Sequence, residues 1–317
     1  MPALYQNNQD IPDNMLLGNL LAYTLTDMTV SEQDLTDAFV NNKLSQHYIR
    51  KISHADAFRR ATSSIKNAKS LYIDDSGNTF EGHINVDEVV NDSMYIKRIV
   101  GIRILNDQKE EVSYVQLGNF VYDRAKDSFS FNLEPNSAQH VSDIPNLFVA
   151  VEKRYMQWSM YHNQDTIRNI INRIVTDMHP IALMSTGINK FIPKTSKDTL
   201  YALKGTLNDL SKYSNNGNGE NVIEIIPFID TQEQRTLVNK MYEEEIKNTL
   251  YEYSMELAEI LKKRQTLSSR QVTTYIEKYK ELSSKVQDYQ NLLGTYTQNI
   301  HDQLKAAFQL IDDNKEV

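Results

Sequence analysis

The C-terminal third of the chain carries large apolar residues at alternating spacings of three and four. Residues 231–312 predict two long helices joined by a turn, and in the second helix these residues follow a heptad repeat over about four heptads. Such a repeat is typical of a coiled coil, because the pattern of a single amphipathic helix drifts at a period of 3.6. The heptad stripe consists of Val272, Tyr275, Tyr279, Leu282, Val286, Tyr289, Leu293, Tyr296 and Ile300.

The length of the second helix and its tyrosines both bear on assembly. A helix of about 44 residues would be roughly 65 Å long, so the hairpin must project from the protein or lie along a partner. Tyrosine hydroxyl groups within the stripe need polar partners or water, which indicates a broad seam between helices or subunits. We therefore expect a homo-oligomer assembled through the heptad stripe. The alternative is that the hairpin packs only on its own chain.

Composition limits the class of protein. The 317 residues can form about two domains, and the small number of Gly (10) and Pro (7) favours long, mostly helical elements. The absence of cysteine excludes disulfides, zinc-thiolate sites and thiol nucleophiles. The N-terminal residues lack the basic and apolar regions of a signal peptide, and no segment approaches a membrane span. We therefore expect a cytoplasmic protein with no membrane partner.

Periodicity and turn residues divide the chain into four segments, with a linker at 134–145. An apolar stretch at 15–25 is expected to begin the first segment as a helix. The predicted fold class is α+β, mostly α. The segments are a helical region at 1–70, an antiparallel β meander at 71–135, a small α+β module at 146–230 and an antiparallel coiled-coil hairpin at 231–312.

Charge is distributed unevenly near the N-terminus. Residues 1–42 carry six carboxylates and neither Lys nor Arg, whereas residues 43–69, the basic block, carry seven cations against one acid, Asp56. Because adjacent segments usually pack together, we expect the two blocks to neutralise each other within one helical domain. The alternative is a sequence-nonspecific nucleic-acid interface on a helix predicted from 54 to 69. Its candidate residues are Arg50, Lys51, Arg59, Arg60, Lys66 and Lys69.

Catalytic and cofactor motifs are not found in the sequence. No glycine-rich phosphate loop occurs, and the seven histidines show no metal-ligand spacing and no adjacent nucleophile. The carboxylate pairs Asp74–Asp75 and Asp87–Glu88 could hold magnesium in a nuclease, but acidic pairs in turns are far commoner than metal sites. We predict no enzyme activity, no cofactor and no metal site.

Three segments resemble an uncharacterised family of bacteriophage and mobile-element proteins that also occurs in some Gram-positive bacteria. They are HADAFRRATSSIK at 54–66, GINKFIP at 187–193 and PFIDTQEQR at 227–235. The resemblance covers most of the chain in the same order. It implies a phage or mobile-element protein that works in the bacterial cytoplasm, and it implies no known activity.

Together these observations predict a non-enzymatic protein. It is expected to act by macromolecular binding and by self-assembly through its C-terminal coiled coil, with a host or phage protein as a further partner. The alternative is a protein that binds DNA or RNA through the basic helix near Arg59. A metal-dependent nuclease ranks third.

Overall fold

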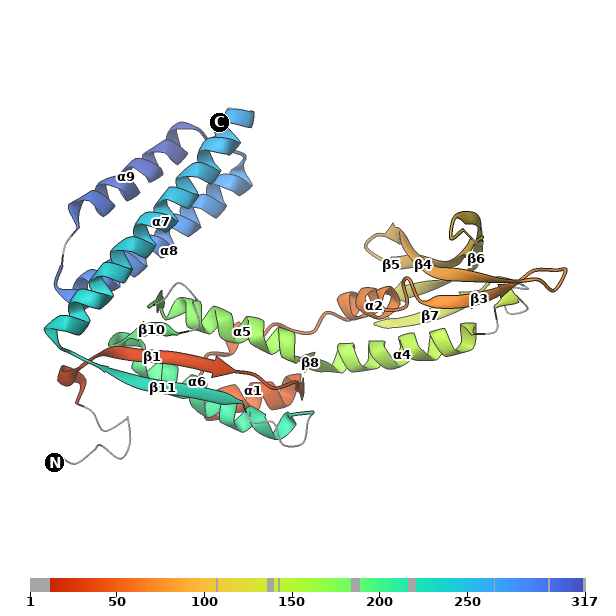
Figure 1. Ribbon diagram of the computed structural model, residues 1–317, viewed down its shortest axis with the longest axis horizontal. Coiled ribbons are helices and arrows are strands. Elements are labelled where there is room, and N and C mark those ends of the chain that lie inside the picture. The colour runs from red at the N-terminus through yellow and green to blue at the C-terminus, as the bar shows by residue number, and fades with distance from the viewer. Residues whose placement is uncertain are drawn as a thin grey trace. The chain divides into compact units, whose positions relative to one another are not determined.

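The protein is a mixed α+β chain that forms two compact units (Figure 1). The computed structural model describes residues 12–106, 108–135, 140–141, 143–183, 189–215, 221–264, 266–295 and 297–315. The first unit comprises Met1–Thr26, Ala38–Tyr48 and Arg168–Val317, and the second comprises Asp27–Asp37 and Ile49–Ile167. Helices α1 (Glu32–Asn41) and α5 (Gln164–Asp177) each span a boundary. None of the helices in the described ranges is long and apolar enough to cross a membrane.

The second unit contains the predicted antiparallel meander, which is confirmed. Its strands pair in chain order, and β5 is the central one. A two-stranded sheet of β2 (Thr29–Ser31) and β8 (Tyr161–Asn163) also belongs to this unit. The meander strands are β3 (Lys69–Ile73), β4 (Thr79–Asn91), β5 (Tyr95–Leu105), β6 (Glu111–Asp123) and β7 (Ser128–Leu133).

Helices α2 (His54–Ser63) and α4 (Ile144–Met160) pack on one face of this sheet (Figure 1). Alternate residues of β5, such as Ile96, Val100 and Ile102, are buried beneath them, as expected for a strand with one covered face. Apolar residues of α4 belong to the same core. The predicted linker at 134–145 therefore does not separate two domains. Its residues 136–139 and 142 lie outside the described ranges.

The first unit is built on an antiparallel sheet with the strand order β11-β1-β10-β9 (Figure 1). Helix α6 (Lys197–Leu210) packs against β11 and buries its leucines. Short 3-10 turns occur at Asp13–Met15, Gln46–Tyr48, Lys194–Ser196 and Ser211–Tyr213. The strands are β1 (Leu16–Thr24), β9 (Ile181–Ala182), β10 (Lys190–Pro193) and β11 (Val222–Ile229).

The prediction of a helix at 15–25 is wrong, because this stretch forms strand β1 in the middle of the sheet. In the regular part of β1, Leu20 packs against the core of the C-terminal helices and its neighbour Leu21 is fully buried. Successive residues of a strand point to opposite faces, so both faces of β1 are covered. A strand covered on both faces has a continuous apolar run, which cannot be distinguished from a buried helix by periodicity.

The prediction of a C-terminal hairpin of two helices is also corrected, because the described residues form three helices. Helix α7 (Gln232–Arg264) is followed by α8 (Ser269–Leu293) and α9 (Gln298–Asp313), where one helix of about 44 residues was predicted. The break follows from Gly294, which adopts a left-handed φ of 67° and whose N–H donates to the Gln290 carbonyl over 2.9 Å. The end of α9 returns to the start of α8, where the Leu267 N–H donates to the Asn314 carbonyl.

The sequence predicts a capping box of Ser268 with Gln271 and a helix start at Asp230 or Thr231, and both are confirmed. The Ser268 N–H donates to the Gln271 side chain over 3.0 Å in the capping box of α8. The Gln234 N–H donates to the Thr231 hydroxyl at the start of α7. In contrast, the helix predicted from 54 to 69 ends at Ser63, and Asn67 takes a positive φ of 64° just before β3. The helix therefore ends six residues earlier than the spacing of its apolar residues predicts.

Candidate interaction surfaces

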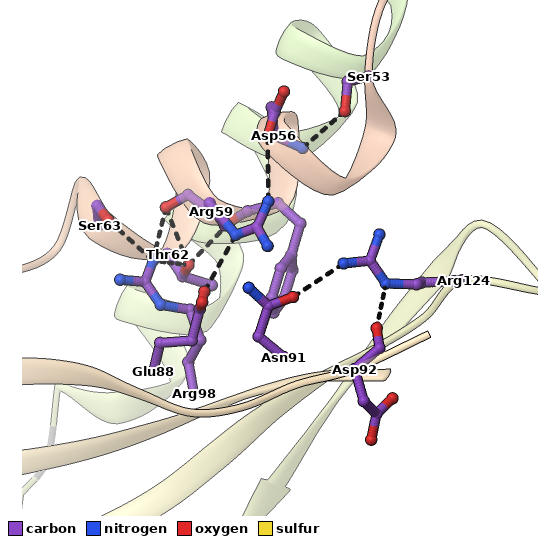
Figure 2. Close-up of polar contacts among 11 residues, drawn as sticks. Ser53, Asp56, Arg59, Thr62, Ser63, Glu88, Asn91, Asp92, Arg98 and Arg124 are labelled. Carbon is purple, nitrogen blue, oxygen red and sulfur yellow. Dashed lines mark hydrogen bonds and ion pairs between the residues drawn. The ribbon is translucent and has the colours of Figure 1, made fainter. Parts of the chain in front are cut away.

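The basic block lies in α2 and its flanks, and its central residue is already paired. Arg59 contacts Asp56 and Glu88, each at 3.1 Å (Figure 2). Ser53 caps the same helix by accepting the Asp56 N–H over 3.2 Å. Asp56 comes from the same helix, whereas Glu88 comes from β4. The guanidinium of Arg59 therefore bridges the helix to the sheet.

Two other cations of the basic block also contact acids on β4. Lys66 lies 3.9 Å from Asp87, and Lys69 lies 3.1 Å from Glu81. The sequence led us to expect that acids of residues 1–42 would neutralise these cations. Lys66 and Lys69 instead contact acids of β4. Strand β4 follows the block in sequence and returns past it through the β3–β4 hairpin. Part of the positive charge that could contact phosphates is therefore balanced inside the second unit.

Among the described residues, three candidate cations form no ion pair with an acid, unlike Arg59, Lys66 and Lys69. Arg50 and Lys51 are exposed just before α2. Arg60 is exposed on α2, and its guanidinium carbon lies 4.9 Å from the centre of the Trp158 ring on α4. These three residues are the part of the predicted nucleic-acid surface that remains available to phosphates.

Nucleic-acid binding through this surface is expected to be weakly salt-dependent. Three free cations can release about three counterions, so log K should fall against log[salt] with a slope no steeper than about −3. Changing Arg50 and Lys51 to Glu should reduce the slope by about two, whereas changing the exposed Lys280 on α8 and Lys305 on α9 to Glu should leave it unchanged. Fluorescence anisotropy with a short labelled duplex measures this. A slope steeper than −5 would show that the paired cations contact phosphates as well.

A buried arginine on β5, which the sequence analysis did not identify, forms hydrogen bonds to the end of α2. Arg98 on β5 is 9% exposed and donates to the Arg59 carbonyl (2.7 Å), the Thr62 hydroxyl (2.6 Å) and the Ser63 hydroxyl (2.8 Å) (Figure 2). Burial lowers the pKa of Arg98, and the nearby Glu88 carboxylate partly opposes that shift. The cation lies beside the last turn of α2, where the helix dipole favours positive charge.

The acidic pairs that could have held magnesium are used in local structure. Asp74 accepts the N–H groups of Ser76 (2.9 Å) and Asn78 (2.8 Å) in the β3–β4 turn. The hydrogen bonds from Asn78 hold the pKa of Asp74 below its ordinary value. Asp87 and Glu88 contact Lys66 and Arg59, as described above. In the part of the chain that the structure describes, no three His, Asp or Glu side chains converge into a metal site.

The heptad stripe lies inside the first unit and is not a free surface. Tyr279, Val286 and Tyr289 are fully buried among residues of α7 and α9, and Phe191 of β10 belongs to the same core cluster. The remaining described positions are also buried, except for Val272, which is partly buried; Tyr296 lies outside the described residues. The stripe thus packs on its own chain, which was the alternative to a seam between subunits.

Two tyrosines of the stripe, Tyr275 and Tyr289, have polar partners for their hydroxyl groups, as burial requires. The rings of Tyr242 and Tyr289 stack with their centres 5.1 Å apart, and the Tyr289 hydroxyl donates to the His179 carbonyl over 2.9 Å. Burial raises the pKa of Tyr289 well above its ordinary value and that of Tyr242 to about 12. Tyr275 donates to Glu256 over 3.2 Å. The hydroxyl groups of Tyr275 and Tyr289 are therefore hydrogen-bond donors inside the bundle.

A cluster of charged groups joins the loop after α5 to the bundle. His179 contacts Asp288 at 2.6 Å, and Lys285 donates to the Pro180 carbonyl at 2.5 Å and pairs with Glu245. Every group in this cluster has a partner from another segment, so the contacts hold the loop against α7 and α8. Among the described residues, the hydroxyl groups that line the hollow belong to Thr176, Thr249 and Tyr253, and the chain has no cysteine. We therefore interpret the cluster as an anchor.

The helices also carry exposed apolar residues. On α7, Tyr251 is 66% exposed and Met255 is 47% exposed, and on α9 Leu310 is 40% exposed. A groove of about 500 Å³ runs between α7 and α9, lined in part by Tyr251 and Leu310. On α4, Met156 is 55% exposed. The sequence analysis did not identify the residues on α7, although a second set of residues at spacings of three and four runs along that helix.

The comparisons with known proteins identify a family but no activity. The chain belongs to the Family of unknown function (DUF6744), whose model matches residues 16–313. No curated protein and no solved structure matches the chain.

Proposed function

We propose that this member of a family of unknown function is a non-enzymatic binding protein that associates with itself through its C-terminal helices. The exposed apolar side chains of α7 carry the proposal. The interior of the bundle is filled by the heptad stripe, yet Tyr251 and Met255 remain outside it in solvent. Adjacent large apolar residues on one exposed helix face are a feature of protein–protein contacts.

The surroundings of α7 support an interface more than a catalytic site. The groove beside Tyr251 also contains Ala306 and Leu310, and among the described residues that line it Lys247 is the one charged at neutral pH. Catalysis requires a nucleophile, base or metal ligands held together, and this groove is lined mainly by apolar and neutral polar groups. Binding of another macromolecule is the function that such a surface supports.

The biological setting is proposed from the sequence resemblance. The segments at 54–66, 187–193 and 227–235 support an origin in a phage or mobile element and a place in the bacterial cytoplasm. A host or phage macromolecule would be the further partner. Nucleic-acid binding through Arg50, Lys51 and Arg60 is the weaker alternative, because Arg59, Lys66 and Lys69 of the same block contact acids.

Self-association is tested by the mass of the full chain in solution. At micromolar concentration, light scattering should give at least twice the 36.6 kDa of one chain. Met255→Glu should return the protein to a monomer, because association would bury the new charge against apolar groups. Met156→Glu, a change of the same residue type at an exposed position of α4, is the matched control and should leave the mass unchanged.

Two outcomes would contradict the proposal. A mass of one chain for the unmodified protein across the micromolar range would show that it does not associate. A dimer that Met156→Glu disrupts and Met255→Glu leaves intact would place the interface on α4.

A further inference from the structure

The exposed side of α7 contains a complete helix-pairing pattern. Between positions 244 and 262, eight exposed residues lie within an arc of roughly 120° when each residue advances the helix by about 100°. Positions 244, 248, 251, 255, 258 and 262 lie along the centre of this arc. Their spacings alternate between four and three, which is the pattern of a two-stranded seam. The outer face of α7 consists of Glu244, Lys247, Asn248, Tyr251, Met255, Ala258, Glu259 and Lys262.

The opposite side of α7 is already used. Tyr242, Ile246 and Leu257 are fully buried in the core cluster with α8 and α9. The two patterns therefore belong to different partners. The inner side packs on the same chain, and the outer face has its apolar residues in solvent.

The outer face is complementary to itself in the antiparallel direction. Residues equally distant from position 253 form matched pairs: Tyr251 with Met255, Lys247 with Glu259, and Glu244 with Lys262. A twofold axis at this level would place each residue opposite the second member of its pair on another copy. The centre of such a contact is apolar and both ends carry opposite charges. We propose that α7 pairs with α7 of a second copy, antiparallel, about a twofold axis level with residue 253.

Other arrangements of the same two helices are less favourable. A parallel pair in register would place each charge against itself, such as Lys247 against Lys247 of the second copy. An antiparallel pair centred on residue 251 would place Lys240 opposite Lys262, and one centred on residue 255 would place Tyr251 opposite Glu259. Like charges at a seam oppose association, and so does a carboxylate placed against an apolar ring, so the pattern selects one direction and one register.

The charges at the seam are free to change partners. Within one chain, Lys247 contacts Glu243 at 3.2 Å and Glu259 contacts Lys263 at 3.9 Å. Both are solvent-exposed pairs four residues apart on one helix, which contribute little to stability. Grooves on both sides of the outer face, one beside Tyr251 and one beside Asn248, leave room for side chains at the margin of a second helix.

This inference rests on the proposed self-association and specifies its partner and geometry. A charge-swap experiment tests the register. Lys247→Glu alone and Glu259→Lys alone should each weaken dimerisation about tenfold, because each places like charges opposite one another twice in the symmetric dimer. The double swap should restore the affinity of the unmodified chain. Sedimentation equilibrium measures all four proteins, and circular dichroism confirms that each is folded.

A second experiment tests the direction of the helices and uses the absence of cysteine in the chain. Asn248→Cys and Ala258→Cys are prepared as separate proteins and mixed under mild oxidation. The antiparallel pair brings position 248 of one copy near position 258 of the other, within the range that a disulfide can bridge. The mixture should therefore form a cross-linked dimer faster than either protein alone.

The outcomes separate this inference from the proposed function. A monomeric unmodified chain overturns both. A dimer that neither responds to the single charge changes nor forms the mixed cross-link overturns the pairing of α7 and leaves self-association standing. Faster cross-linking of Asn248→Cys with itself than with Ala258→Cys shows a parallel pair and also overturns the proposal.

Discussion

Replacing Val286 by aspartate is expected to unfold the C-terminal bundle. Val286 is fully buried on α8 among residues of α7 and α9. The change removes apolar packing and places a carboxylate where no water reaches it, which we expect to lower the free energy of unfolding by about 4 kcal/mol or more. The free energy of unfolding of a folded unit is only about 5–15 kcal/mol. Part of the variant population should therefore be unfolded even without denaturant.

The single tryptophan allows the two units to be followed separately. Trp158 lies in α4 of the second unit, so its fluorescence reports that unit, whereas far-ultraviolet circular dichroism reports the helices of both. For Val286→Asp, the helical signal should fall while the fluorescence transition in urea stays in place. Ser284→Asp adds the same charge at an exposed position of α8 and should change neither signal.

A stable Val286→Asp variant would contradict the packing of the heptad stripe. If the variant kept its helical content and its unfolding midpoint but lost only its oligomeric mass, the stripe would be a seam between subunits. Its burial within one chain would then be wrong. The experiment therefore distinguishes the two interpretations of the heptad repeat that the sequence leaves open.

The heptad repeat shows what a pattern can and cannot predict. Its spacing indicates a buried apolar stripe, and Tyr279, Val286 and Tyr289 are buried. Spacing does not say which residues cover the stripe, because residues of α7, α9 or another chain could all do so. Gly294 is a recognisable helix stop, but a heptad that continues to Ile300 obscured it.

Short-range signals predicted local structure well. The turn at 74–78 and the capping box at Ser268 depend on residues within five positions of one another, and both are present. Strand β1 depends instead on β11, which is about 200 residues away and pairs Leu20 with Ile226. The residues near β1 in the sequence carry no information about its pairing with β11. The apolar run at 15–25 was therefore interpreted as a helix.

The same distinction applies to the basic block. Its cations were identified from the sequence, whereas their acids on β4 are brought close only by strand pairing. Arg98 could not be chosen from the sequence, because an arginine between apolar strand residues more often faces solvent. The outer face of α7 was missed for another reason. The run of three acids at 243–245 is typical of a solvated face, which hides the pattern that Glu244 forms with Tyr251 and Met255.

Replacing Arg98 by alanine is the second large expected effect. The guanidinium is the donor to the Arg59 carbonyl, Thr62 and Ser63, and the side chain fills the space between β5 and α2. The variant loses charge-assisted hydrogen bonds and leaves a cavity, so the free energy of unfolding of the second unit should fall by about 2–4 kcal/mol. The Trp158 transition should shift by about 1–2 M in urea.

Arg103→Ala is the matched control for this prediction, because Arg103 is exposed on the same strand and lies 3.8 Å from Glu111. An exposed pair of this kind contributes about 0–1 kcal/mol, so its midpoint should move little. Arg98→Lys should recover only part of the loss, because an ammonium group on a shorter chain cannot replace the planar guanidinium. Equal effects of Arg98→Ala and Arg103→Ala would show that the buried arginine does not hold α2 on the sheet. A loss confined to Arg98 would instead identify it as the residue that keeps Arg59 and Arg60 in place on the surface of the second unit.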